Sequence, residues 1–192
     1  MDDLDKTMAP RREHANAGAD DMTMPGKRDR KPDGLVQNLE TSAISSPYFN
    51  TFIAAQVHGS DRSLLSNSAK VADLLSAGDV HHIFPKEFLK MNGIDDKSMY
   101  NQVANYAYLD TGVNISIGKQ APQDYFTAAL NQCATKELKV GTITENVALR
   151  DNLAVNCIPA DIFTMTAVDY EKFLKERRIL MAKKIKEYYN SL

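Results

Sequence analysis

The sequence predicts an α+β fold: a mostly helical domain that contains one small hairpin and ends in a long helix. Two observations lead to this expectation. Apolar residues recur at helical spacing in several segments, of which 167–189 is the longest. By contrast, two short segments, 79–84 and 106–109, have the β-prone composition of strands. No internal repeat with a period of roughly 20 to 50 residues is visible.

The first part of the folded region should contain two helices, a strand and a helical turn. Residues 48–57 carry apolar side chains at helical spacing. A second short helix is expected over 68–75 and should end at the glycine that follows, because glycine is common just after helices. The β-prone segment 79–84 is closed by Pro85. Residues 86–91 can then form a helical turn.

The second part should contain the other strand and three helices. The strand 106–109 is followed by turn-prone residues. Pro122 is expected to begin a helix, because proline fits the first helical position well. Another helix is expected over 145–154. In the last helix, 167–189, acidic residues lie at the start and lysines crowd the end, as the helix dipole favours.

The first 45 residues differ in composition from the rest of the chain. Residues 1–34 hold three of the seven prolines and three of the nine glycines, with charges of both signs and no helical or strand period. Such a segment buries too little apolar surface to offset the entropy lost on ordering. We therefore expect a disordered tail over 1–45 and one folded domain over 46–192.

The composition is that of a globular protein in a reducing compartment. The 192 residues are enough for one domain with a real core, and 43% hydrophobic with 25% charged residues is ordinary for that class. No apolar run approaches the roughly 20 residues that span a bilayer, and the acidic N-terminus does not resemble a signal peptide. Cys133 and Cys157 lack a CxxC partner and are expected to be free thiols. We expect a cytoplasmic protein with no membrane partner.

The net charge of −2 limits how this chain could bind nucleic acid. It excludes a strongly basic body that grips DNA by bulk electrostatics, so any contact must come from a local patch. Between residues 169 and 187, seven basic residues stand against four acidic ones. This run is either a solvated amphipathic face or a ridge that contacts phosphates.

Two adjacent histidines, His81 and His82, lie on the first expected strand. Neighbours on a strand point to opposite faces, so both can serve one site only where the backbone twists, bulges or ends. Otherwise one histidine packs in the core and the other is a surface residue. Asn105 and Asn114 flank the second strand, and each taken singly is a cap or turn residue.

Taken together, these residues resemble a known nuclease motif. The run His82-Ile83-Phe84-Pro85, then Asn105, then Asn114 nine residues later is similar to the HNH (His-Me finger, ββα-metal) endonuclease motif. The region from residue 46 to the C-terminus also resembles the HNH region of bacterial restriction proteins of the GmrSD type. Those proteins pair a ParB-like, nucleotide-dependent domain with an HNH nuclease. Runs that carry this wider resemblance are 46–50, 78–86 and 173–185.

The resemblance implies a ββα-metal core over 78–120 and a role for each residue of the motif. His82 is the general base that deprotonates the attacking water, for which a neutral imidazole is suited. Asn105 orients the segment that bears the base. His81 and Asn114 hold one divalent metal ion, and Asp79, two residues before His81, is a reserve ligand.

The histidine at position 81 is a departure from the family pattern. The family usually has a metal-ligating aspartate there and uses Mg²⁺. A neutral imidazole gives the metal no compensating negative charge, so Mg²⁺ should bind less well, while Mn²⁺ or Ni²⁺ suits imidazole better. We therefore expect activity to favour Mn²⁺ or Ni²⁺ over Mg²⁺ at equal concentration.

The resemblance implies hydrolysis of DNA phosphodiester bonds, in restriction of foreign or modified DNA as an antiviral defence. The lysines Lys86, Lys90 and Lys119 are candidates for phosphate contacts, although each is equally a plain surface lysine. The alternative is a truncated, non-catalytic DNA-binding or interaction module derived from such a nuclease. In either case a separate ParB-like, nucleotide-hydrolysing protein is a candidate partner.

Overall fold

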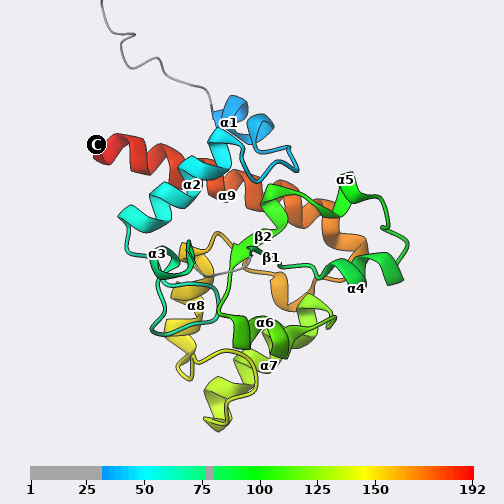
Figure 1. The fold of residues 1–192 in the computed structure, drawn as a ribbon. Helices are drawn as coiled ribbons and strands as arrows, with labels where there is room; N and C mark the ends of the chain where they lie inside the picture. The colour runs from blue at the N-terminus through cyan, green and yellow to red at the C-terminus, as the bar shows by residue number, and fades with distance from the viewer. Residues whose placement is uncertain (1–31, 77–79) are drawn as a thin grey trace, which may run out of the picture.

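The computed structural model of the chain describes residues 32–76 and 80–192. Within these residues, helices surround one pair of short strands (Figure 1). The α-helices and strands are α1 Pro32–Asn38, α2 Pro47–His58, α3 Val71–Leu74, β1 Val80–His82, α4 Lys86–Met91, α5 Lys97–Tyr100, β2 Tyr106–Tyr108, α6 Thr111–Ile117, α7 Pro122–Thr135, α8 Asn146–Val155 and α9 Tyr170–Ser191. Short 3₁₀ helices are η1 Val103–Asn105, η2 Ile162–Thr164 and η3 Ala167–Asp169. The predicted mostly helical α+β architecture is confirmed.

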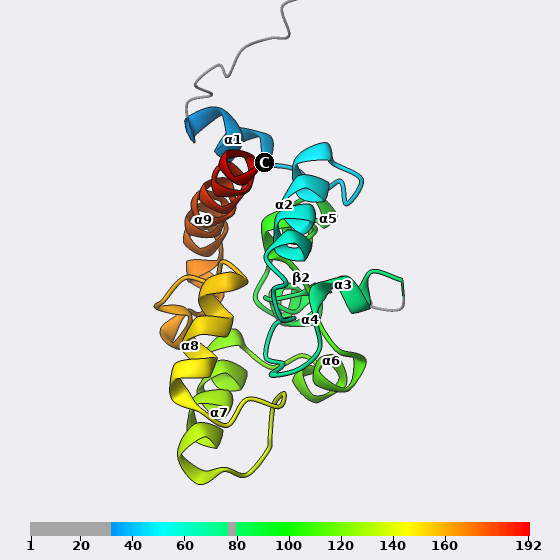
Figure 2. The same cartoon turned by 90° about the vertical axis from the view of Figure 1, so that its left-hand side faces the viewer.

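The helices form two layers that enclose the core. Figure 2 shows α7, α8 and α9 following one another along one side, with α2, β2 and α6 on the other. The long helix α9 also packs against both α1 and α2. Its buried residues recur every three or four positions, which is the period of an amphipathic helix. They are Tyr170, Phe173, Leu174, Arg177, Met181, Ala182 and Ile185.

The two strands form an antiparallel hairpin of regular register. His81 pairs with Ala107, and His82 pairs with Tyr106. The strand β1 is shorter than the predicted 79–84, because it ends at His82 and a bend follows at residues 83–84. The bend arises because the N–H of Phe84 donates to the side chain of Asn105 instead of to a neighbouring strand.

The end of β1 is anchored in the aromatic core. The ring of Phe84 is fully buried and lies 5.2 Å from the ring of Tyr170 and 4.7 Å from the ring of Phe173, between centroids. Both partners belong to α9. Tyr125 of α7 donates a hydrogen bond of 2.7 Å to the carbonyl of Ile83. The residues just after the two histidines are therefore held by two helices, α9 and α7.

The prediction of a disordered tail over 1–45 was wrong for residues 32–45, and residues 1–31 lie outside the described residues. Helix α1 packs on α9, and the side chains of Leu35 and Leu39 are buried. The carbonyl of Thr41 accepts a hydrogen bond of 2.8 Å from the N–H of Val103. A helix of two turns is too short for its apolar period to be recognised in the sequence. The folded domain therefore begins before residue 46.

The other helices agree with expectation in most places. Helices α2, α4 and α8 match their predicted ranges to within about two residues, the usual uncertainty of helix ends, and α7 begins at Pro122 as predicted. The helix predicted over 68–75 is shorter, at Val71–Leu74, because the hydroxyl of Ser66 binds the N–H groups of Ser68 and Ala69 in a turn. Helix α5 was not predicted, and α6 was expected only from the resemblance.

Two further expectations concern the thiols and the membrane. Cys133 and Cys157 are both free and buried, as expected. No helix in the described part of the chain is both long and apolar enough to cross a membrane.

The burial of Leu39, in the segment before α2, leads to the first prediction, which concerns the stability of the fold. Leu39→Ala should lower the free energy of unfolding by about 3 kcal/mol, because a fully buried leucine is removed and a cavity is left. Ile44→Ala, at a side chain that is 48% exposed in the same segment, is the matched control and should change it by less than about 1 kcal/mol. Urea denaturation of both variants measures the difference, and equal small effects would contradict the packing of this segment.

Candidate active site

The histidines lie on the first of two paired strands, which are separated in the chain by α4, α5 and η1, and a helix follows the second strand. Strands β1 and β2 pair, and α6 begins two residues after β2 ends (Figure 1). The carboxylate of Asp110 caps α6 by accepting a hydrogen bond of 2.8 Å from the N–H of Gly112. This tight connection turns the chain back towards the hairpin. It brings Asn114, in the middle of α6, next to His81.

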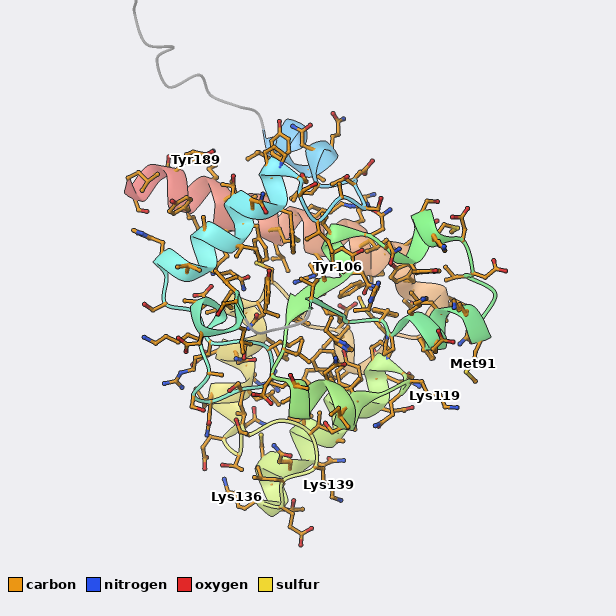
Figure 3. All side chains as sticks on the ribbon, viewed as in Figure 1. Met91, Tyr106, Lys119, Lys136, Lys139 and Tyr189 are labelled. Carbon is orange, nitrogen blue, oxygen red and sulfur yellow. The ribbon has the colours of Figure 1, made fainter. Side chains whose placement is uncertain are left out.

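His82 is half-buried and held on several sides. Its Nε2 lies 2.9 Å from Oδ1 of Asn101, within hydrogen-bond distance. The ring meets that of Tyr106 edge to face at 5.0 Å and that of Tyr100 at 6.3 Å, between centroids. Figure 3 shows Tyr106, the first residue of β2, in the middle of the molecule. Both the position and the tilt of the imidazole are therefore defined by neighbouring side chains.

The surroundings of His82 keep its imidazole neutral. Burial lowers the pKa of His82, the hydrogen bond to Oδ1 of Asn101 partly opposes this, and the charge of Lys86 lowers the pKa further. The net direction is downward from the ordinary value of about 6.5, so the ring is uncharged at neutral pH. A neutral imidazole can accept a proton, which is the first requirement of a general base.

His81 is half-buried in a different environment from His82. Its Nε2 is buried and has no hydrogen-bond partner among the described residues. Burial, and then the charge of His82, lower the pKa of His81 to about 4, while the amide of Asn114 acts in the opposite direction. The ring is therefore neutral over the physiological range. A neutral imidazole with an unpaired nitrogen has the form in which histidine binds metals.

Asn105 is fully buried and connects the two strands' ends through its side chain. Its Oδ1 accepts a hydrogen bond of 2.8 Å from the N–H of Phe84, and its Nδ2 donates to the carbonyls of Phe84 (3.1 Å) and Tyr100 (3.2 Å). Its backbone carbonyl accepts from the N–H of Ile83 at 2.8 Å. Asn105 thus fixes the backbone immediately after His82. It does not itself contact either histidine through a hydrogen bond among the described residues.

Two of the three candidate lysines lie near His82. The Nζ atoms of Lys86 and Lys90 lie 5.5 and 5.9 Å from the ring centroid of Tyr100, over its face. Lys90 also forms an ion pair of 3.1 Å with Glu87, which offsets part of its charge. Lys119 is exposed and points outward after α6 (Figure 3). No contact within the described part of the chain joins Lys119 to the two histidines.

Asn101 is the residue of the site that sequence reasoning missed. It lies 19 residues after His82, at the end of α5, a four-residue helix that no apolar period predicts. An asparagine after a short helix has the composition of an ordinary cap, and the sequence holds no signal that pairs it with His82. Asp79, the reserve metal ligand, lies outside the described residues.

The donors next to α6 fit a divalent metal ion. A buried ring nitrogen without a partner costs free energy unless a ligand or water meets it, and His81 Nε2 is such an atom. The adjacent amide of Asn114 adds an oxygen donor. Within residues 32–76 and 80–192, no three His, Cys, Asp or Glu side chains lie close enough to hold a metal. The described donor set is therefore one imidazole and one amide.

Two hollows elsewhere on the surface are weaker candidates for a catalytic site. One, of about 310 Å³, is lined mainly by α7 and includes Asp124. The other, of about 280 Å³, lies beside α8 and includes Asp61. The Asp61 carboxylate forms an ion pair of 2.6 Å with Lys184. Neither hollow contains a histidine, so the hairpin remains the better candidate site.

Comparison with family models, with curated proteins and with solved structures found no match for this chain. We therefore infer a function from the chemistry of the site and from the resemblance of its motif.

The buried amide of Asn105 gives the second prediction. Asn105→Ala should lower the free energy of unfolding by about 3 kcal/mol, because it leaves the N–H and the carbonyl of Phe84 unpaired in the core and removes one of the two hydrogen bonds to the carbonyl of Tyr100. Asn92→Ala is the control, since the exposed Asn92 side chain makes one hydrogen bond, to the carbonyl of Phe88. That change should cost less than about 1 kcal/mol. Chemical denaturation compares the two, and an Asn105→Ala protein as stable as the control would contradict the buried network.

Proposed function

We propose that the chain is a metal-dependent endonuclease of the HNH type, which hydrolyses phosphodiester bonds in DNA. One observation carries the proposal: a hairpin followed at once by a helix brings Asn114 to His81, with the neutral His82 as the next residue. This is the order of elements and side chains that the motif resemblance implies. A buried metal-type donor beside a neutral base is also the minimum chemistry for hydrolysing a phosphodiester.

In the proposed reaction His82 is the general base. It removes a proton from a water molecule as the water oxygen forms a bond to phosphorus. The bond from phosphorus to the 3′ oxygen breaks, and that oxygen leaves with the electron pair and takes a proton from solvent. The products carry 5′-phosphate and 3′-hydroxyl ends. The hydrogen bond to Asn101 and the packing of the ring hold the base in place during this step.

His81 and Asn114 are the residues that would hold the metal ion, and Asp79 is a third candidate. When bound, the metal supplies positive charge to the phosphate and to the leaving oxygen. The low pKa of His81 favours metal binding, because no proton has to be displaced from the ring at neutral pH. Asn105 contributes by fixing the backbone after His82.

Phosphate binding is assigned to the lysines beside the site. Lys86 and Lys90 place two cationic groups over Tyr100, on the side of His82, and Lys119 is the remaining candidate. A local patch of this kind is what a chain with a net charge of −2 needs in order to meet a polyanion. Restriction of foreign or modified DNA in the cytoplasm, together with a ParB-like nucleotide-hydrolysing partner, follows from the resemblance alone and is proposed on that basis.

The histidine that acts as base gives the third prediction. His82→Ala should reduce metal-dependent cleavage of plasmid DNA by at least about 100-fold, because the proton acceptor is lost. The exposed His58 on α2 provides the control, and His58→Ala should cleave like the wild type. DNA affinity, measured by fluorescence anisotropy, should be nearly unchanged in both variants. A wild-type protein that binds DNA but cleaves none with any divalent metal would instead support a non-catalytic binding module.

The ligand at position 81 gives the fourth prediction. At equal concentration, Mn²⁺ or Ni²⁺ should support faster cleavage than Mg²⁺, because imidazole is a poor ligand for a hard cation. His81→Asp supplies a carboxylate and should raise the Mg²⁺ rate relative to the Mn²⁺ rate. Initial rates across the three metals, for the wild type and for His81→Asp, measure this ratio. Mg²⁺ as the best metal for the wild type would overturn the assignment of His81 as a ligand.

A further inference from the structure

The backbone that carries Asn101 is fixed more firmly than its position at the end of a short helix suggests. The carbonyl of Tyr100, the residue before it, accepts hydrogen bonds from Nδ2 of Asn105 at 3.2 Å and from the hydroxyl of Tyr170 at 3.2 Å. The N–H of Asn101 donates to the carbonyl of Lys97 at 3.0 Å. Asn101 is thus anchored both to the core and to α9. Its side chain is presented to His82 by an element that has little freedom to move.

The side chain of Asn101 has one hydrogen bond among the described residues, and it is the bond to His82. An amide oxygen can only accept, so the Nε2 that faces it must carry a proton. In a neutral imidazole the other nitrogen then has a free lone pair. Packing cannot make this choice, because Tyr100 and Tyr106 touch the ring through their aromatic faces and edges and have no preference between its tautomers.

We propose that Asn101 is a positioning residue that fixes His82 in the tautomer protonated at Nε2, so that Nδ1 is the atom that takes the proton from water. The catalytic half of this inference rests on the proposed nuclease function, while the tautomer is a property of the folded chain itself. When Nδ1 accepts the proton, the ring becomes an imidazolium whose Nε2–H still donates to Asn101. The same bond therefore serves the base before and after proton transfer.

The test compares two substitutions at one position. Asn101→Leu keeps the approximate volume but removes the acceptor, whereas Asn101→Asp keeps an acceptor oxygen in the same place. Asn92→Leu, on the exposed end of α4, is the matched control. The full chain labelled with ¹⁵N-histidine is examined by two-bond ¹⁵N–¹H correlation at about pH 8, where histidine is largely neutral. His82→Gln identifies the signals of His82.

The wild type, Asn101→Asp and Asn92→Leu should show one tautomer of His82, protonated at Nε2. Asn101→Leu should show a mixture. In the cleavage assay with Mn²⁺, Asn101→Leu should lower kcat by about tenfold, with KM changed less than about twofold, because the residue acts through the base and does not touch DNA. Asn101→Asp should restore most of kcat.

Three results would overturn the inference. They are a wild-type His82 protonated at Nδ1, an Asn101→Leu protein with the wild-type tautomer, and a loss of kcat that Asn101→Asp shares with Asn101→Leu. Failure of the nuclease proposal looks different, because the wild type would then cleave no DNA while the tautomer of His82 still reports on Asn101. The spectra thus decide the part played by Asn101 whether or not the chain cleaves DNA.

Discussion

The geometry of the hairpin depends on the hydrogen bonds that the buried guanidinium of Arg177 donates. Arg177 is 1% exposed and donates hydrogen bonds to the carbonyls of Ala104 (2.8 Å), Tyr106 (2.7 Å) and Asn156 (3.3 Å). Burial lowers the pKa of Arg177 to about 10, so the group stays charged at neutral pH. Among the described residues no carboxylate pairs with it, and only carbonyl dipoles compensate the charge. Losing these carbonyls while the guanidinium stays buried would leave its charge uncompensated, which is strongly unfavourable.

Two of the three carbonyls that Arg177 binds, those of Ala104 and Tyr106, lie on either side of Asn105, so the charge of α9 and the amide of Asn105 act on the same stretch of backbone. The side chain of Asn105 in turn forms hydrogen bonds with the backbone N–H and carbonyl of Phe84, two residues after the candidate base. Tyr170, about two helical turns before Arg177 on α9, donates a hydrogen bond to the carbonyl of Tyr100, the residue before Asn101. Two side chains of α9, Tyr170 and Arg177, therefore fix the backbone that positions the imidazole of His82, although neither is in contact with that ring. This is why a single helix far from the chemistry can determine the precision of the site.

The sequence was most informative where a local pattern determines the structure. Helices α2, α7, α8 and α9 follow from apolar period and from proline or charge at their ends. The β-prone composition of residues 79–84 and 106–109 also located the two strands that pair. What could not be predicted depends on contacts between distant segments. The burial of Leu39 requires α9 to be in place, and the pairing of Asn101 with His82 requires the fold itself. In the sequence, Arg177 is one of the seven basic residues between positions 169 and 187, and nothing distinguishes it from the others. In the structure its side chain is buried.

The adjacent histidines have separate partners, and this follows from the regular register of β1. Because neighbouring strand residues leave on opposite sides, His81 meets Asn114 of α6, while His82 meets Asn101 at the end of α5. Burial lowers the pKa of both rings, so both imidazoles are neutral at neutral pH. Among the described residues, only one of them, His82, has a hydrogen-bond partner for its Nε2. The unsatisfied ring is the natural donor to a metal, and the satisfied ring, with one nitrogen already committed, is the natural base. In the proposed nuclease, a carboxylate at position 81 would add a negative charge next to the phosphate, whereas a neutral histidine adds none.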